Sequence, residues 1–251
     1  MKQLPNGLLI EQAAVSISLI FAQNFFKVKG KHVALLIAII LIADQLIKIY
    51  IKTHYFLGEE HKVAGDWFRL HFVENEGMAW GWKFGGGLGK VLLTLFRLVA
   101  VIAGTFIIRG FIKKGYTKGF IICASLIYAG AFGNLIDSMF YGLIFNESIP
   151  YAQNVAQLFP AGGGYGSFLH GKVVDMFYFP IIDTNLPSWL PFWGGERFEF
   201  FQPVFNLADA SISSGVIVLL LFQKRFMPHK EHTQPTPVET EAIVDDKSQV
   251  L

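Results

Sequence analysis

The sequence predicts an α-helical membrane protein with four transmembrane helices and a small extracytoplasmic region rich in β-strand. Of the 251 residues, 53% are hydrophobic and only 16% are charged, whereas soluble domains contain about 25% charged residues. Four stretches approach the roughly 20 apolar residues that cross a bilayer. Lysine and arginine are concentrated at alternate ends of these stretches, as on the cytoplasmic flanks of spanning helices. A soluble protein with an unusually apolar core is the alternative class.

The four predicted spans are residues 33–51, 88–108, 119–143 and 205–222. Arg97 interrupts the second span, and the third is rich in small residues. Basic residues precede the first span, separate the second from the third and follow the fourth. They are Lys27, Lys29, Lys31, Arg109, Lys113, Lys114, Lys118, Lys224, Arg225 and Lys230. Because cytoplasmic flanks carry such an excess, we expect both termini in the cytoplasm and the connections 52–87 and 144–204 outside.

The membrane domain is predicted to cover residues 31–225, with a segment of different character at each end. Residues 1–30 contain the apolar patch "AAVSISLIF", which is too short to span and has no obvious signal cleavage site close behind it. We expect a peripheral or flexible N-terminal extension there, with a cleaved signal as the alternative. Residues 226–251 are polar, contain proline and end acidic, which is typical of a disordered tail. We expect this tail in the cytoplasm.

The two outward connections contain strand and loop signals. Apolar and polar residues alternate around "DWFRLHFVENEG", which predicts a short strand. The second connection contains "PAGGGYGS" and "LPSWLPFWGG", where turn formers alternate with aromatic residues, as in loops that rest at the lipid headgroups. Trp80, Trp82, Trp189 and Trp193 are either interfacial anchors, which we favour, or a lid over a groove.

Polar residues inside the spans gather near one depth. Asp44 and Lys48 are four residues apart and therefore share a helix face. The outward ends of the third and fourth spans carry Asn134, Asp137, Asn206 and Asp209. Ionisable groups within spans usually face a bundle interior or a wet cavity. These residues therefore predict either a shared site near the outer surface or an ion-pair network that only holds the helices together.

The outward connections add further candidates. "FVENEGMAWGW" presents Asn75 and Gly77 after the predicted strand. "GKVVDMFYFP" places Asp175 directly after two valines, so this carboxylate lies in an apolar setting. An ordinary turn or edge-strand aspartate is the alternative interpretation of Asp175.

Together these motifs resemble the lipoprotein signal peptidases, also called signal peptidase II, which are four-helix aspartic proteases of bacterial inner membranes. The resemblance rests on five elements in the family's order. They are Asp44 with Lys48, the Asn-x-Gly-x-Ala element "NEGMA", the small-residue element "AGAFGNLID", then "GKVVDM" and "FNLAD". The resemblance extends from about residue 33 to residue 224.

By this resemblance, Asp175 and Asp209 are the catalytic pair. The positions that match those lining or supporting the family's site are Asn75, Asn134, Asn206, Asp44, Lys48, Asp137 and Gly77. The implied reaction removes the signal peptide of a prolipoprotein on the N-terminal side of a cysteine that already carries diacylglycerol. The implied partners are these precursors and membrane lipids, and the implied place is the bacterial inner membrane, with the site near its outer face. We expect a monomer.

The chain departs from the family pattern at three places. Ser138 stands where the family usually has arginine after "GNLID", so Arg97 is the candidate for supplying the missing cation. Met176 replaces the usual phenylalanine, and residues 145–170 form a long insert before "GKVVD". We expect this insert to modulate substrate access and not the chemistry.

The residues also favour carboxylate chemistry by themselves, because two carboxyl groups that share one proton can activate water and protonate a leaving nitrogen. The sequence has no HExxH motif and no clustered His and Cys set, so we expect no metal and no other cofactor. No basic cluster interleaved with aromatic residues indicates nucleic-acid binding. We give the lone Cys123 no role and interpret Ser211 and Ser213 as polar residues at a helix N-terminus. A proton-coupled multi-pass transporter and a non-catalytic membrane scaffold remain the alternative functions.

Overall fold

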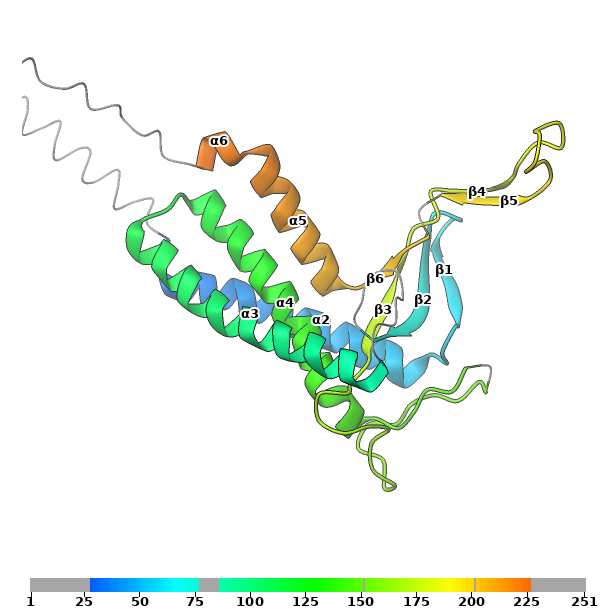
Figure 1. Cartoon of the computed structure of the whole chain (residues 1–251), viewed down its shortest axis with the longest axis horizontal. Helices are drawn as coiled ribbons and strands as arrows, with labels where there is room; N and C mark the ends of the chain where they lie inside the picture. The colour runs from blue at the N-terminus through cyan, green and yellow to red at the C-terminus, as the bar shows by residue number, and fades with distance from the viewer. Residues whose placement is uncertain (1–27, 77–85, 151, 201, 227–251) are drawn as a thin grey trace, which may run out of the picture.

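The computed structural model describes residues 28–76, 86–150, 152–200 and 202–226, with helices gathered at one side and strands at the other (Figure 1). The helices are α2 (Gly30–His54), α3 (Gly86–Lys114), α4 (Lys118–Ile144), α5 (Leu207–Leu221) and α6 (Gln223–Phe226). The predictions for residues 1–27 and 227–251, and for Gly77, Trp80 and Trp82, lie outside the described residues.

Helices α2, α3 and α4 are each long and apolar enough to cross a membrane, so three of the predicted spans correspond to long apolar helices. On α2 the exposed apolar side chains recur every three or four residues, so they form one face of the helix. They are Leu35, Ile39, Ile42, Leu46 and Tyr50. A helix of a membrane protein presents such a face to lipid, because its backbone polar groups are already satisfied internally.

Helix α5 is shorter than the predicted fourth span. Its 15 residues give a length of about 22 Å at 1.5 Å per residue, whereas the hydrocarbon core is about 30 Å thick. The helix cannot begin earlier, because the side chain of Asn206 caps it and accepts a hydrogen bond from the backbone N–H of Asp209. It ends at Phe222, where the chain turns into α6. The described helices therefore include three of full spanning length and not four.

Helix α4 occupies the centre of the bundle and packs against α2, α3 and α5. Its small residues permit this close packing, which is typical of helix interfaces in membranes. A Cβ atom on Gly133 would lie 2.7 Å from Asp44 Oδ2. Glycine at this position therefore allows a carboxylate of α2 to lie directly against the backbone of α4.

The main sheet is antiparallel and has the strand order β1-β2-β3-β6. Its strands are β1 (Glu60–Ala64), β2 (Phe68–Asn75), β3 (Val173–Tyr178) and β6 (Val204–Phe205). Strand β2 lies within the stretch for which alternation predicted a strand. Asp175 lies opposite Val73 in β3, which has β2 on one side and β6 on the other. Asp175 is therefore on an interior strand and not in a turn or on an edge strand.

A buried apolar cluster joins this sheet to the ends of the helices. Its members come from α2, β2, α4, the insert and β3: Ile51, Phe72, Tyr141, Phe145, Ala156, Val174 and Met176. The chain enters β3 against α4, where the backbone N–H of Gly171 donates to Ser138 O at 2.9 Å. A Cβ on Gly171 would lie 2.0 Å from Asp137 O, so this approach requires glycine. The contact brings the start of β3, and with it Asp175, to one end of the helix bundle.

Candidate active site

Lys48 lies between two aspartates inside the helix bundle. Its Nζ is 2.9 Å from Asp44 Oδ2 on the same helix and 2.8 Å from Asp137 Oδ2 on α4, and the three side chains are at most 1% exposed. We call these three residues the Lys48 centre. Asp44 Oδ1 also accepts a hydrogen bond of 2.9 Å from the backbone N–H of Ala208 in the first turn of α5. The centre therefore joins three helices through charges that are paired and hydrogen-bonded, as buried charges must be.

Gln45 belongs to the same cluster, although the sequence analysis did not single it out. Its Nε2 donates to Asp137 Oδ1 at 2.8 Å, and its Oε1 accepts from the hydroxyl of Tyr141 at 3.1 Å. A glutamine beside Asp44 inside an apolar span is itself a signal, because polar side chains in spans usually face the bundle interior. Gln45 could therefore have been included from the sequence.

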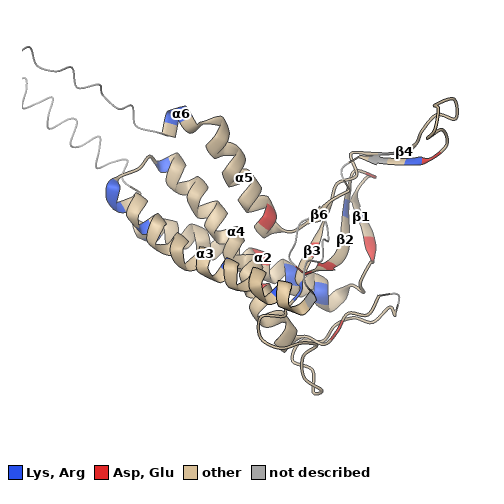
Figure 2. Cartoon of the chain, viewed as in Figure 1, with Lys and Arg blue, Asp and Glu red and all other residues tan. Residues whose placement is uncertain are grey.

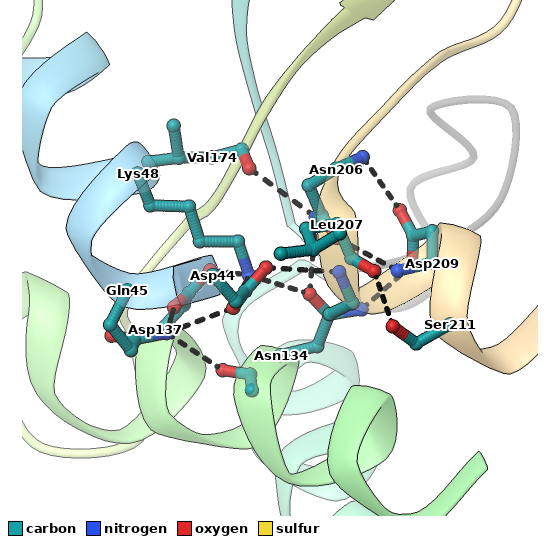
Figure 3. Close-up of polar contacts among 12 residues, drawn as sticks. Asp44, Gln45, Lys48, Asn134, Asp137, Val174, Asn206, Leu207, Asp209 and Ser211 are labelled. Carbon is teal, nitrogen blue, oxygen red and sulfur yellow. Dashed lines mark hydrogen bonds and ion pairs between the residues drawn. The ribbon is translucent and has the colours of Figure 1, made fainter. Parts of the chain in front are cut away.

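Asn134 of α4 connects the Lys48 centre to Asp209, as Figure 3 shows. Lys48 Nζ donates to Asn134 Oδ1 at 2.9 Å, and Asn134 Nδ2 donates to Asp209 Oδ1 at 2.7 Å. The lysine charge thus fixes which way the amide is turned, because its oxygen faces the cation. The NH₂ group of Asn134 is consequently directed at Asp209.

Asn206 holds both members of the predicted catalytic pair. Its Nδ2 donates to Asp175 Oδ1 at 2.7 Å, while its backbone N–H faces Asp209 Oδ2 at 3.5 Å. Asn206 and Asp209 form a reciprocal capping box, for which an asparagine N-cap and an acidic residue three positions later are suited. The second oxygen of Asp175 accepts a hydrogen bond from the amide of Asn75 at the end of β2. The two carboxylates, from β3 and α5, are therefore positioned through one asparagine.

The two carboxyl groups have different environments. Asp175 is 2% exposed, whereas Asp209 is half-buried. Burial first, and the nearby Asp209 carboxylate second, raise the pKa of Asp175 well above its ordinary range. Asp175 therefore keeps its proton at pH values where an ordinary aspartate has lost it. A protonated carboxyl group beside a second, more accessible one is an arrangement suited to general acid and base catalysis.

Arg97 of α3 reaches the position where the family usually has an arginine. Its Nη1 donates to Ser138 Oγ at 3.1 Å, and Ser138 Oγ donates to Asn134 O at 2.9 Å. Ser138 is fully buried. The guanidinium group thus lies against the same turn of α4 that carries Asn134, although it comes from another helix.

A second buried lysine, Lys52, lies one turn beyond Lys48 on α2 and was not identified from the sequence. It forms an ion pair with Glu74 of β2, with both side chains at most 2% exposed. Lys52 Nζ also donates to Ser148 Oγ of the insert at 3.0 Å and lies 5.2 Å from the ring centroid of Tyr165. Lys172 Nζ is 3.8 Å from Glu74 Oε2. We call these five residues the Lys52 centre, and it ties α2 to the sheet and to the insert.

Every predicted site residue except Gly77 belongs to one connected network of hydrogen bonds and ion pairs. Gly77 lies outside the described residues. Ser211 Oγ donates to Leu207 O at 2.9 Å within its own helix, which agrees with its interpretation as a helix N-terminal residue. In the part of the chain that the structure describes, His, Cys, Asp and Glu form no group of three suited to a metal ion.

Known proteins resemble this chain in sequence and in fold. A family model described as signal peptidase (SPase) II matches residues 36–224. The lipoprotein signal peptidase of Porphyromonas gingivalis is 53% identical over 198 residues, which are 78% of this chain and 84% of the relative. That of Amoebophilus asiaticus is 35% identical over 184 residues, 72% of each chain. A solved bacterial membrane enzyme, 23% identical, matches 80% of this chain and 98% of its own with a TM-score of 0.52, so the two share a fold.

Proposed function

This chain belongs to the signal peptidase II family, and on that premise we propose that Asp175 and Asp209 are its catalytic pair. The chain is an aspartic endopeptidase of lipoprotein precursors. It removes the signal peptide on the N-terminal side of the lipid-bearing cysteine. The observation that carries the assignment of the pair is the placement of both carboxylates on Asn206, one through its side chain and one through its backbone.

In the proposed reaction, Asp209 takes a proton from a water molecule that attacks the carbonyl carbon of the scissile peptide. Asp175 gives its proton to the carbonyl oxygen. When the tetrahedral intermediate collapses, the proton on Asp209 passes to the leaving nitrogen, which becomes the amino group of the cysteine, and Asp175 recovers its proton from a hydroxyl of the intermediate. The raised pKa of Asp175 and the greater accessibility of Asp209 support this division of roles.

The surrounding amides and cations have supporting roles in this proposal. Asn75 and Asn206 orient Asp175, and Asn134 orients Asp209 under the control of Lys48. Arg97, hydrogen-bonded to Ser138, supplies the cation that the family usually carries on α4 itself. The enzyme acts as a monomer, with lipid acyl chains beside the apolar faces of its helices.

The proposed topology has four spans, the fourth at residues 205–222, with both termini in the cytoplasm and the catalytic pair near the outer face. Figure 2 shows basic residues at the bundle end that carries α6 and the α3–α4 connection. The described residues at this end, 28–31, 109–118 and 223–226, contain no Asp or Glu. Reporter fusions after Lys114 and Arg225 should report the cytoplasm, and fusions near Gly65 and Gly163 the outer side. A cytoplasmic location of Gly163 would contradict the proposed position of the catalytic pair near the outer face.

The catalytic assignment is tested by Asp175→Asn and Asp209→Asn in purified protein with a lipidated precursor peptide in detergent. Each change removes a proton-transfer group with little change of shape. Such groups are typically worth about 10² to 10⁴ in rate, and a catalytic pair acts as a unit, so the double variant should be barely worse than either single one. Cleavage by the unchanged protein at the cysteine also separates a peptidase from a transporter or a scaffold.

Asp44→Asn and Asp137→Asn are the matched controls, because they change buried carboxylates of the Lys48 centre and should leave partial activity. If the pair only held the structure together, loss of activity would follow loss of thermal stability in all four variants. A folded Asp175→Asn or Asp209→Asn variant that kept a substantial fraction of the turnover would show the assignment to be wrong.

A further inference from the structure

A second, two-stranded sheet stands apart from the site. It is the antiparallel hairpin of β4 (Ile182–Asn185) and β5 (Arg197–Phe200), in which Ile182 lies opposite Phe200. Opposite and alternate residues of a hairpin share a face, so Ile182, Phe198 and Phe200 form one apolar face. All three are exposed. Asn185 and Arg197 occupy the other face by register. The hairpin is therefore an amphipathic ribbon.

The tip of this hairpin, residues 186–195 with the sequence "LPSWLPFWGG", contains no charged residue. Trp189 is 77% exposed, Phe192 92% and Trp193 58%. Soluble surfaces rarely present such contiguous apolar groups unless they bind something. Tryptophan is enriched where a protein meets the headgroup level of a membrane, because its ring is apolar and its N–H is polar.

The tip is a hydrogen-bonded turn that directs these rings outward. The N–H groups of Gly195 and Gly194 donate to Leu186 O and Leu190 O, both at 3.0 Å. Phe192 has a φ of 72°, a left-handed conformation that is uncommon for a bulky residue. These hydrogen bonds constrain the backbone from which the rings project, so little backbone freedom would be lost on binding.

The position of the hairpin favours contact with the membrane over a role as a lid. Figure 1 shows the strands of the main sheet running across the direction of the helices, with β4 and β5 projecting beyond the sheet, away from the bundle. Asp175 lies near the opposite end of β3 from the hairpin. Only six residues separate Phe200 from Leu207, where α5 begins. The hairpin is therefore tied closely to the end of a membrane helix while it extends sideways from the bundle.

We propose that the β4–β5 hairpin is a membrane-surface anchor, which places Trp189, Phe192 and Trp193 among the lipid headgroups beside the bundle. The anchor fixes the height of the main sheet over the bilayer and therefore the depth of Asp175 on β3. The proposal depends on the topology proposed above only for which leaflet the hairpin contacts, namely the outer one. The proposed binding partner of the hairpin is a lipid surface. Binding to another protein is the alternative that the test must exclude.

The test uses the full chain in nanodiscs that hold one protein molecule each, with all five native tryptophans replaced by phenylalanine. Phe192→Trp then provides a single reporter at the tip, and Phe159→Trp provides its matched control. Phe159 is also exposed and also left-handed, with a φ of 53°, but it lies on the insert. Acyl-brominated lipids should quench the Phe192→Trp emission at least twofold more than that of the control, and aqueous iodide should quench it less.

Equal or weaker quenching of Phe192→Trp by brominated lipid would overturn the proposal, whether iodide reaches the reporter or another protein surface covers it. If the tryptophan-free background does not fold, the unchanged chain is compared with Trp189→Phe/Trp193→Phe, and the difference in quenching gives the same information. Neither measurement requires catalysis, so a failed anchor is distinguishable from a failed assignment of the catalytic pair.

Discussion

Lys48 and Lys52 are one turn apart on α2, are both fully buried and are both paired with acidic residues, yet they connect different parts of the molecule. The partners of Lys48 lie on α2 and α4, and Asn134 links it onward to Asp209. The partners of Lys52 lie on β2 and on the insert. A buried lysine paired with carboxylates therefore supports the proposed catalytic pair at Lys48. At Lys52, a similar pair connects α2 to the sheet and the insert.

The difference teaches that buried charge in this protein serves two separable purposes. The Lys48 centre is one hydrogen-bonded residue away from Asp209, so changes there should alter the chemistry. The Lys52 centre is linked to Asp175 through the backbone of β2, where Glu74 is next to Asn75. Changes there should act mainly on stability and on substrate binding.

The largest expected effect is that of Lys48→Met, which leaves two buried carboxylates without their cation. Removing one partner of a buried ion pair costs about 3–5 kcal/mol, and the loss of orientation at Asn134 should lower kcat/KM by more than tenfold. Thermal unfolding in detergent and peptide cleavage measure the two effects. Adding Asp44→Asn and Asp137→Asn should restore much of the stability. A single Lys48→Met variant as stable as the unchanged protein would contradict the role of the centre.

Lys52→Met should be less damaging, because Lys172 remains near Glu74, 3.8 Å from its Oε2. We expect a loss smaller than the roughly 3–5 kcal/mol that a buried ion pair typically costs when one partner is removed, because Lys172 still faces Glu74. KM should rise, while kcat stays within about threefold of its original value. Steady-state kinetics alongside thermal unfolding test this separation, and a fall in kcat as large as that of Lys48→Met would remove the distinction between the centres.

Shortening the insert by deleting residues within 152–166 also tests whether the Lys52 centre affects substrate binding and not the chemistry. This stretch follows Ser148 and includes Tyr165, which contribute to the centre. Because we expect the insert to govern substrate access, KM should rise severalfold with little change in kcat. Loss of kcat at unchanged KM in a folded variant would instead assign the insert to the chemistry.

The pH dependence of stability should differ between the unchanged protein and Asp175→Asn. The pKa of Asp175 is raised in the folded state, so the folded state binds this proton more tightly than the unfolded state. Its contribution favours folding below about pH 4, the ordinary pKa of aspartate, and is lost as the pH rises toward the raised value. As the pH rises from about 4 toward that raised value, Asp175→Asn should therefore lose less stability than the unchanged protein. Thermal unfolding across this range should show the two curves diverging, and parallel curves would be inconsistent with a proton held on Asp175.

The smallest expected effect is that of Ser148→Ala, which removes the hydroxyl between Lys52 and Glu74 but leaves their ion pair intact. Loss of such a hydrogen bond costs about 1 kcal/mol. Activity should remain within twofold, and thermal unfolding should detect only a modest decrease. A loss equal to that of Lys52→Met would mean that the hydroxyl and not the ion pair ties the insert to α2.

The sequence by itself determined the features that depend on neighbours along the chain. Runs of apolar residues predicted four spans, of which three are long helices in the structure, and alternation predicted the strand that became β2. The spacing of four between Asp44 and Lys48 placed both on one helix face, and the ordered motifs identified the family. The length of α5 was predicted less well, because the predicted span began at Phe205, which belongs to β6, whereas the helix begins only after its cap Asn206.

Only the tertiary structure decided which distant residues meet. The pairing of Lys52 with Glu74 and Ser148, the reach of Arg97 to Ser138 and the bridging of Asp175 and Asp209 by Asn206 each join different helices, strands or loops. Helical periodicity relates a residue only to those three or four positions away, and strand periodicity only to alternate positions. Contacts between elements depend instead on how the backbones pack, as where Gly133 and Gly171 allow Asp44 and the start of β3 to lie against α4.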